Sequence, residues 1–432
     1  MLKMKYSGVK WLGNIPDEWK VVRVDYYKDL KSNYPIGDGD HGTVTPEDYI
    51  NEGIPYIRVQ NLSWGNHIIT DNIVYISETI NKKNKKSILK PGDIVIAKTG
   101  ATIGKIGIIP EEMPEANTTS SVGKVSVDNK YSNKYVFYSL LSDSSYQQMW
   151  DKANMKSAQP GFNIEDLVKF KICFPSIKEQ YLIANFLDKK VGTINSIICD
   201  LNDQIEILYK YKKQIITESV TTGLNKNVNF KDSGIDWMGK MPKHWIVKPL
   251  KYMFYMYAGG DINEYDFSDI KEENYIYPIY SNSLENKGLF GFTSKYRFSG
   301  KTFTVTGRGD IGYAIPRFDK YYPIVRLLVC VPKNGDDNRY YSYCVNSANV
   351  IGDQTAMAQL TTQRLGMVKV PHPPLEEQKI IADYLDKKCS EIEEILNSKI
   401  KQKEQMEQYK KSVIYEYVTG KKRVEGAEEL YG

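Results

Sequence analysis

Apolar residues recur at alternating gaps of three and four residues along a stretch in the middle of the chain. The series is Ala184, Leu187, Val191, Ile194, Ile198, Leu201, Ile205 and Leu208, and Ile215 falls back in phase after Lys212. A seam of this period is typical of a helix that pairs with another helix. Residues 178–217 contain no proline and one glycine, so the pattern predicts a single helix about 60 Å long.

A second seam of the same period occurs within residues 376–417. It weakens at Lys399 and Lys403, and its apolar members are Ala382, Leu385, Cys389, Ile392, Leu396, Met406 and Val413. A long helix with one apolar stripe needs a partner. We expect the two helices to pair antiparallel, because two copies of one element can meet around a pseudo-twofold axis; the alternative is that each packs on its own domain. Thr221-Thr222-Gly223 and Thr419-Gly420 predict the helix ends.

The other apolar segments are short and end at turn residues, which is typical of strands. The predicted strands are 54–61, 92–98, 106–109, 122–127, 302–306, 313–315 and 324–331, and the predicted helices are 134–150 and 339–345. Each half of the chain therefore begins with a mixed α/β domain of short strands.

Two sequence blocks occur twice in the chain. Residues 7–19 return as 233–245, and residues 175–190 return as 373–388. A repeat of this kind predicts two similar halves, while the segments between the blocks differ in length and content. The expected boundaries are a first domain at 1–175, a central helical region at 176–225, a second domain at 226–372, and a distal helical region with its tail at 373–432.

Composition limits the class of protein only broadly. Of 432 residues, 41% are hydrophobic, which is enough for packed cores, and a net charge of +5 is weak support for a nucleic-acid partner. The five cysteines form no Cys-x-x-Cys pair, which favours a reducing compartment. No apolar run reaches the length of a membrane span, so we expect a soluble, cytoplasmic protein with no membrane partner.

Motifs for catalysis are incomplete throughout the chain. Residues 307–312 match Gly-x-Gly-x-x-Gly, but the next residues read as a strand and not as the helix of a dinucleotide site, so a glycine turn between strands is favoured. Residues 100–105 lack the spacing of a phosphate loop, and His372-Pro373-Pro374-Leu375 lacks the amide and the aromatic residue of an adenine methyltransferase loop. The four histidines lie far apart. We expect no catalytic site, no metal site and no cofactor in this chain.

The polar groups that remain suit DNA. Arginine can pair with guanine, asparagine or glutamine with adenine, and lysine with phosphate, although lysine runs are often only solvated surface. The candidate DNA-binding residues are Arg58, Gln60, Asn61, Lys82, Lys83, Lys85, Lys86, Lys98, Thr99, Lys105, Asn282, Arg297, Arg308 and Arg317.

The repeated blocks carry a family resemblance. Ser-Gly-x-x-Trp-x-Gly-x-x-Pro-x-x-Trp opens each half at 7–19 and 233–245, and Pro-x-x-x-Glu-Gln before a long helix closes each half at 175–180 and 373–378. Over essentially its whole length, the chain resembles the specificity (S) subunit of type I restriction-modification enzymes. The resemblance implies an α+β fold: two mixed α/β target recognition domains, separated by two long, conserved, antiparallel paired helices in a pseudo-twofold repeat. No individual DNA-reading residue is carried over from the family.

The resemblance also implies the partners. They are double-stranded DNA, two modification subunits that bind S-adenosylmethionine and methylate adenine, and restriction subunits that use ATP and Mg and cut DNA. We therefore expect a non-catalytic subunit that recognises a bipartite, asymmetric DNA site. The alternatives are a stand-alone sequence-specific DNA-binding regulator and a nuclease with an unrecognised site.

Overall fold

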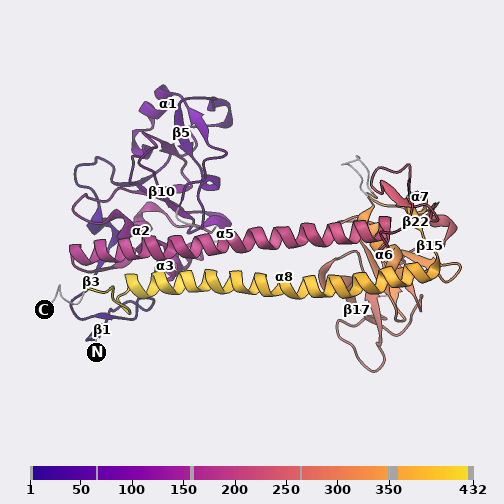
Figure 1. The fold of residues 1–432 in the computed structure, drawn as a ribbon. Helices are drawn as coiled ribbons and strands as arrows, with labels where there is room; N and C mark the ends of the chain where they lie inside the picture. The colour runs from indigo at the N-terminus through magenta and orange to yellow at the C-terminus, as the bar shows by residue number, and fades with distance from the viewer. Residues whose placement is uncertain are drawn as a thin grey trace. The chain divides into compact units, whose positions relative to one another are not determined.

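The computed structural model describes residues 3–64, 67–155, 160–262, 265–348, 350 and 359–426. The chain forms two compact units. Unit 1 comprises residues 1–202 and 401–432, and unit 2 comprises residues 203–400. Figure 1 shows the elements of each unit along the chain.

Two long helices are confirmed close to their predicted bounds. They are α5 (Ile177–Thr222) and α8 (Leu375–Val418). In unit 1 the beginning of α5 packs against the end of α8, because Leu187 and Val191 share one core with Val413 and Val418. In unit 2 the order is reversed: Val220, near the end of α5, shares a core with residues 381–385 of α8. The helices therefore pair antiparallel, and separate packing of each helix on its own domain is ruled out.

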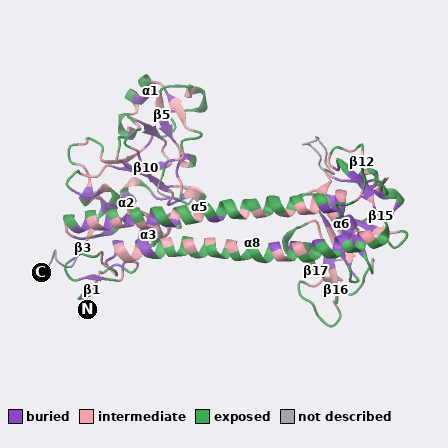
Figure 2. Cartoon of the chain, in the orientation of Figure 1, coloured by how far each residue is buried: buried purple, intermediate pink, exposed green. Residues whose placement is uncertain are grey.

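The predicted seam is the packed face of both helices. Its apolar members are buried or half-buried, as the alternation of colours along α5 and α8 in Figure 2 shows. Lys212, which occupies a seam position, forms an ion pair with Glu393 at 2.6 Å. The weak stretch at Lys399 and Lys403 does not interrupt α8, because helix hydrogen bonding continues through seam positions that carry lysine.

In its described residues, unit 1 has two sheets and two strand pairs beside the helices. The four-stranded sheet has the order β4 (Ile36–Asp38), β10 (Val122–Val125), β7 (Ile94–Ala97), β8 (Ile106–Ile108). The three-stranded sheet has the order β6 (Val74–Ile76), β5 (Ile54–Ile57), β9 (Asn117–Thr118), and the pairs are β1 (Met4–Tyr6) with β2 (Asn14–Pro16) and β3 (Lys20–Arg23) with β11 (Lys171–Phe174).

Unit 2 repeats this arrangement. Its four-stranded sheet has the order β15 (Phe254–Ala258), β21 (Leu328–Pro332), β18 (Thr302–Val305), β19 (Ala314–Arg317). Its three-stranded sheet is β17 (Leu289–Thr293), β16 (Tyr277–Tyr280), β20 (Tyr322–Pro323), and its pairs are β12 (Phe230–Asp232) with β13 (Lys240–Pro242) and β14 (Ile246–Pro249) with β22 (Lys369–His372). The internal repeat thus extends from the sequence blocks to the whole fold.

The shorter helices complete each unit. They are α1 (Glu78–Lys83), α2 (Asn133–Leu141), α3 (Asp143–Ala153), α4 (Ile164–Leu167), α6 (Asn338–Ser347) and α7 (Thr362–Met367). The 3-10 turns are 24–27, 46–48, 59–61, 85–87, 100–102, 250–252 and 285–288. The single helix predicted at 134–150 is two helices, because Ser142 has an extended backbone. The strand predicted at 54–61 stops at Ile57, where a 3-10 turn begins at Val59, and the strand predicted at 324–331 begins only at Leu328, after a turn.

The two repeated sequence blocks of each half meet in space. The buried indole of Trp19 donates from Nε1 to Oε2 of Glu179 at 2.9 Å. Trp245 makes the same bond to Glu377 at 2.9 Å. The blocks are therefore repeated because they fasten the start of each half to the first turn of its long helix.

Candidate nucleic-acid interface

The glycine-rich segment at 307–312 is a turn between two antiparallel strands. It joins β18 to β19, and Gly309 and Gly312 have φ of +68° and +90°, which glycine adopts without steric cost. In unit 1 the turn between β7 and β8 uses Gly100 and Gly104 in the same way, with φ of +65° and +89°. No helix follows either turn, so the dinucleotide interpretation is excluded and the predicted strand–turn–strand is confirmed.

A polar loop follows the central strand of each three-stranded sheet. In unit 1 it is residues 58–61 after β5, and in unit 2 it is residues 281–284 after β16. The side chain of Asn282 accepts a hydrogen bond from the backbone N–H of Gly307 at 2.7 Å. In unit 2 the polar loop therefore braces the glycine turn, and two segments that the sequence marked separately belong to one surface.

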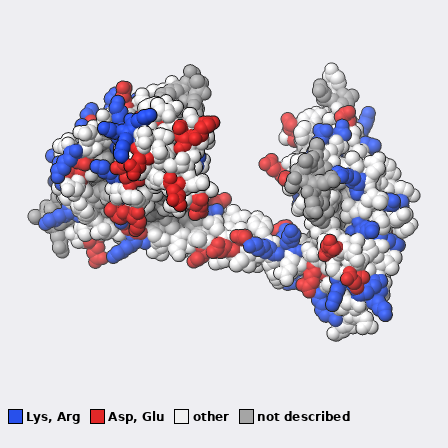
Figure 3. Space-filling model, turned by 90° about the horizontal axis from the view of Figure 1, so that it is seen from above, with Lys and Arg blue, Asp and Glu red and all other residues white. Residues whose placement is uncertain are grey.

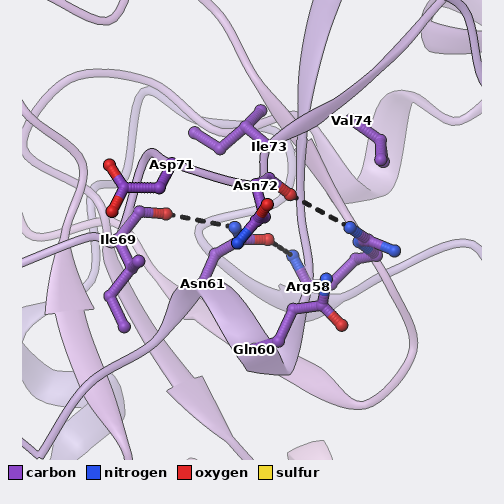
Figure 4. A pocket seen from close by; sticks show the side chains of 8 residues that line it. All are labelled: Arg58, Gln60, Asn61, Ile69, Asp71, Asn72, Ile73 and Val74. Atoms are coloured by element: carbon purple, nitrogen blue, oxygen red, sulfur yellow. Dashed lines mark hydrogen bonds between the residues drawn. The ribbon is translucent and has the colours of Figure 1, made fainter. Parts of the chain in front are cut away.

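The polar loop of unit 1 borders an open pocket of about 560 Å³. Figure 4 shows its lining: Arg58, Gln60, Asn61, Ile69, Asp71, Asn72, Ile73 and Val74. The guanidinium of Arg58 donates to the backbone oxygen of Asn72 at 3.1 Å, and its central carbon lies 5.4 Å from the ring centre of Tyr49. The side chain of Gln60 is exposed. Arg58 is thus held in a fixed position beside a free amide-bearing side chain.

Three of the candidate residues are inside the fold. Asn61 is 1% exposed; its side-chain oxygen accepts from the N–H of Arg58 at 2.9 Å and its amide donates to Ile69. Lys98 is 4% exposed and forms an ion pair with Asp38. The prediction that Asn61 and Lys98 contact DNA is therefore corrected, because the polar atoms of both side chains already have partners within unit 1.

Arg317 is the third buried candidate. It is 5% exposed, and its central guanidinium carbon lies 3.6 Å from the ring centre of Tyr280. Nε donates to the hydroxyl of Thr304 at 3.0 Å and Nη2 donates to the backbone oxygen of Lys287 at 2.8 Å. Burial lowers the pKa of this guanidinium. Arg317 therefore holds β19 to its neighbours, and the DNA-contact interpretation is corrected for this residue as well.

The other candidates differ in exposure. Thr99 and Lys105 are half-buried at the ends of the first glycine turn, and Asn282 is half-buried at the second. Arg297 is exposed and donates to the backbone oxygen of Ala258 at 3.2 Å. Arg308 is exposed between Gly307 and Gly309, at the tip of the glycine turn.

The lysine cluster lies on the surface of unit 1. Lys82 and Lys83 end α1, Lys85 and Lys86 form the 3-10 turn that follows, and all four side chains are exposed. Lysines in the last turn of a helix are favoured by its dipole. Ile80 of α1 packs on the core that contains Tyr56 of β5, so the cluster and the polar loop share one small substructure. Figure 3 looks down on this end of unit 1 and shows Lys and Arg gathered there beside acidic side chains.

Arg326, Asp71 and Asn72 are polar residues beside the candidate surfaces that no sequence motif marks. Arg326 is exposed and donates from Nη1 to the side-chain oxygen of Gln359 at 2.9 Å. Its backbone oxygen lies so close to Gly307 that an added Cβ would meet it at 2.5 Å. Arg326 was not a candidate, because it lies within residues 324–331, which the sequence predicts as a strand. Asp71 and Asn72 line the pocket beside Arg58. They lie in a short turn before β6, outside every motif that the sequence contains.

Metal ligands and buried thiols can be described for the part of the chain that the structure covers. No group of three or more His, Cys, Asp or Glu side chains there could hold a metal ion. Burial raises the pKa of the Cys173 thiol to about 12, and burial likewise raises the pKa of Cys344, so neither sulfur is an activated nucleophile. Among the described helices, none is both long and apolar enough to cross a membrane.

Comparisons with known proteins agree with this fold. The family described as type I restriction modification DNA specificity domain matches residues 39–207 and 242–402, one match in each half. The chain is 27% identical over 457 residues to the type I restriction enzyme MjaVIII specificity subunit of Methanocaldococcus jannaschii, covering 95% of this chain and 94% of that protein. It is 22% identical over 352 residues to the type I restriction enzyme EcoprrI specificity subunit of Escherichia coli, covering 79% and 81%.

A solved structure of a type I restriction-modification system contains a chain with the same fold. The TM-score is 0.70 at 13% identity, and the match covers 94% of this chain and 98% of that one. The family match in each half defines the chain as a protein with two DNA specificity domains. The chain belongs to the family of type I restriction-modification specificity subunits, which supply DNA sequence recognition to the restriction-modification complex.

Proposed function

We propose that this chain recognises a bipartite, asymmetric DNA site, with each unit reading one half. One observation carries the proposal: the same recognition fold occurs twice, but its surface residues differ. The loop after β5 presents Arg58 and Gln60, whereas the loop after β16 has Ser281 and Ser283 at the same distance from its strand. Different groups in equivalent places would select different bases.

The solvent-accessible candidate residues suggest two kinds of DNA contact. Arg58, Gln60 and Arg308 are proposed to contact base edges, since arginine pairs with guanine and glutamine with adenine in the major groove. The lysine cluster on α1 is proposed to neutralise phosphates, which adds affinity for any sequence. Arg326 and Arg297 are proposed as further contacts of unit 2, because both are exposed on the domain that carries the second glycine turn.

The chemistry is proposed to come from partner subunits. Two modification subunits would bind S-adenosylmethionine and flip the target adenine into their own pockets. Restriction subunits would use ATP and Mg to drive cleavage. The chain itself would hold no cofactor, and it would act in the cytoplasm. The family membership and the relatives named for type I restriction enzymes support this assignment.

The test is reconstitution. The purified chain alone should neither methylate nor cut DNA, and addition of the cognate modification subunit with S-adenosylmethionine should give adenine methylation at one bipartite sequence. Co-purification with the modification subunit separates this function from that of a stand-alone regulator. Methylation or cleavage by the chain alone that survives further purification would overturn the proposal.

A further inference from the structure

A third repeated block lies between the two that frame each half. Residues 132–138 read Ser-Asn-Lys-Tyr-Val-Phe-Tyr and residues 337–343 read Asp-Asn-Arg-Tyr-Tyr-Ser-Tyr, an interval of 205 residues. They form the N-cap and the first turns of α2 and α6. We call these two segments the helix-docking motifs, because most of their shared side chains bond to α5 or α8.

The first tyrosine of each motif reaches the end of a long helix. In unit 1 the hydroxyl of Tyr135 contacts the backbone oxygens of Cys173 at 3.0 Å and Val418 at 3.2 Å. In unit 2 the hydroxyl of Tyr340 contacts the backbone oxygen of Val220 at 3.0 Å and lies 3.5 Å from that of Pro371. Both tyrosines are fully buried. Val418 and Val220 occupy the same position in α8 and α5, so the two contacts are equivalent.

The basic residue and the last tyrosine of each motif bind one aspartate of the other long helix. In unit 1 the hydroxyl of Tyr138 donates to Oδ1 of Asp188 at 2.8 Å, and Lys134 forms an ion pair with the same carboxylate. In unit 2 the hydroxyl of Tyr343 donates to Oδ1 of Asp386 at 2.8 Å. Arg339 binds Asp386 at 2.9 Å. Each carboxylate thus joins a basic and a phenolic side chain of a recognition domain to a long helix.

The N-cap of each motif is held by the repeated glutamine. Oε1 of Gln378 accepts the N–H of Asp337 at 2.9 Å, and its amide donates to the backbone oxygen of Pro373 at 3.0 Å. Gln180 accepts the N–H of Ser132 at 3.4 Å and donates to Pro175 at 3.2 Å. The glutamine of Pro-x-x-x-Glu-Gln therefore binds the N-cap of the docking motif to the first turn of the long helix.

The pattern of identity separates docking from ordinary core packing. Lys134, Tyr135 and Tyr138 keep their chemistry as Arg339, Tyr340 and Tyr343, whereas the buried Val136 and Phe137 are replaced by the buried Tyr341 and Ser342. Tyr341 adds a contact that unit 1 lacks the side chain for, because its hydroxyl accepts from Gln378 at 3.4 Å. A core position needs only apolar volume, but a directed hydrogen bond needs a particular group in a particular place. Apart from Asn133 and Asn338, which bond within their own domains, the retained groups are those that bond to a long helix.

We propose that the helix-docking motifs set the orientation of each recognition domain on the helix pair, and that Tyr138 and Tyr343 with Asp188 and Asp386 are positioning residues that decide which gap between half-sites is accepted. The proposal rests on the proposed bipartite recognition. A domain that can rock on its helices reaches the DNA at more than one position, so loss of a docking bond relaxes the gap. The bases read within each half should not change, because the substituted docking residues are not among the side chains proposed to contact base edges.

The experiment uses the full chain assembled with its modification subunit. Tyr138→Phe and Tyr343→Phe each delete one hydroxyl and keep the ring. The matched control is Tyr322→Phe, which deletes a hydrogen bond to the backbone oxygen of Asp261 inside the second recognition domain. Methylation rates are measured on duplexes that carry both half-sites with the natural gap or a gap changed by one base pair. The readout is the methylation rate on the duplex with the changed gap divided by the rate on the duplex with the natural gap.

Both docking variants should raise the ratio about tenfold, since a hydrogen bond to a carboxylate is worth about one decade in an equilibrium. The half-site bases should stay the same, and the control should leave the ratio unchanged. An unchanged ratio in folded docking variants, or an equal loss of rate at every gap, would overturn the proposal. If the phenylalanine variants fail to assemble, Asp188→Asn and Asp386→Asn, which keep an acceptor oxygen and remove the charge, decide by the same ratio. A wild-type complex with no bipartite methylation would instead refute the proposed function.

Discussion

Two arginines nine positions apart should behave in opposite ways when they are replaced. Arg308 is exposed at the tip of the second glycine turn, whereas Arg317 is buried in β19. The sequence predicts both as DNA contacts and does not distinguish between them. We expect Arg317→Met to weaken folding and Arg308→Ala to weaken only binding of the cognate site.

The expected loss at Arg317 follows from its contacts. Two hydrogen bonds from a charged donor contribute about 1.5–3 kcal/mol each, and stacking on the Tyr280 ring contributes about 2 kcal/mol in a desolvated place. The cost of burying the charge offsets part of this sum. Methionine restores apolar volume but leaves the backbone oxygen of Lys287 without this donor, so we expect a net loss of about 3 kcal/mol in the free energy of unfolding. The free energy of unfolding of Arg317→Lys should lie between those of the unmodified protein and Arg317→Met, because lysine keeps the charge and loses the planar contact with Tyr280.

The expected loss at Arg308 is one of affinity. A good arginine–guanine contact is worth about 1–3 kcal/mol, which is roughly a 5- to 150-fold rise in Kd. Stability should change by less than about 0.5 kcal/mol, as at most exposed positions.

Urea unfolding and competition binding to cognate and random duplexes give both quantities for each variant. The reasoning is refuted if Arg317→Met folds normally but loses discrimination between the duplexes. It is refuted equally if Arg308→Ala lowers stability, since that residue would then hold the turn.

Three further predictions follow from the same structure. Alanine at the four lysines of the α1 cluster should weaken binding to all DNA sequences alike and reduce the slope of log K against log salt by about 0.9 per lost phosphate contact; losses confined to the cognate site would contradict a phosphate role. Burial, then the charge of Lys248, holds the pKa of His372 below 6.5. The folded state therefore binds fewer protons than the unfolded state below about pH 6.5, and stability falls as pH drops through that value; His372→Gln should flatten the dependence of Tm on pH between about 7.5 and 5.5, and an unchanged slope would exclude His372 as its source. Seven residues inserted after Asn202 and seven after Ile400 keep both seams in phase. Because they add about 10 Å of helix, the accepted gap should lengthen by about three base pairs, and adenine methylation mapping that shows the original gap with activity retained would rule out the helices as the determinant.

The long helices and the repeat were determined by the sequence alone. A heptad seam is a local property, so the predicted 178–217 and 376–417 lie within one to five residues of the observed bounds of α5 and α8. The glycine turn at 307–312 was also predictable, because glycine spacing and the flanking apolar residues decide between a strand and a helix within a short window.

Exposure of the candidate polar residues was decided by the tertiary structure. Lys98 and Arg317 look like surface cations in the sequence, but Asp38 and Tyr280, which lie 60 and 37 residues earlier, enclose them. Charge and residue type cannot report burial when the covering groups come from distant strands. Only the folded sheet separates Arg308, which is free to meet a ligand, from Arg317, which is part of the core.

The helix-docking motifs depend on both the sequence and the tertiary structure. Their repeat at 132–138 and 337–343 is visible in the sequence, but it carries no meaning there, because the partner of Tyr135 at Val418 lies 283 residues away. Periodicity predicts that a helix has a face to bury. Which domain that face holds, and through which hydroxyl and carboxylate, is fixed only when the chain closes and distant backbone groups come within hydrogen-bonding distance.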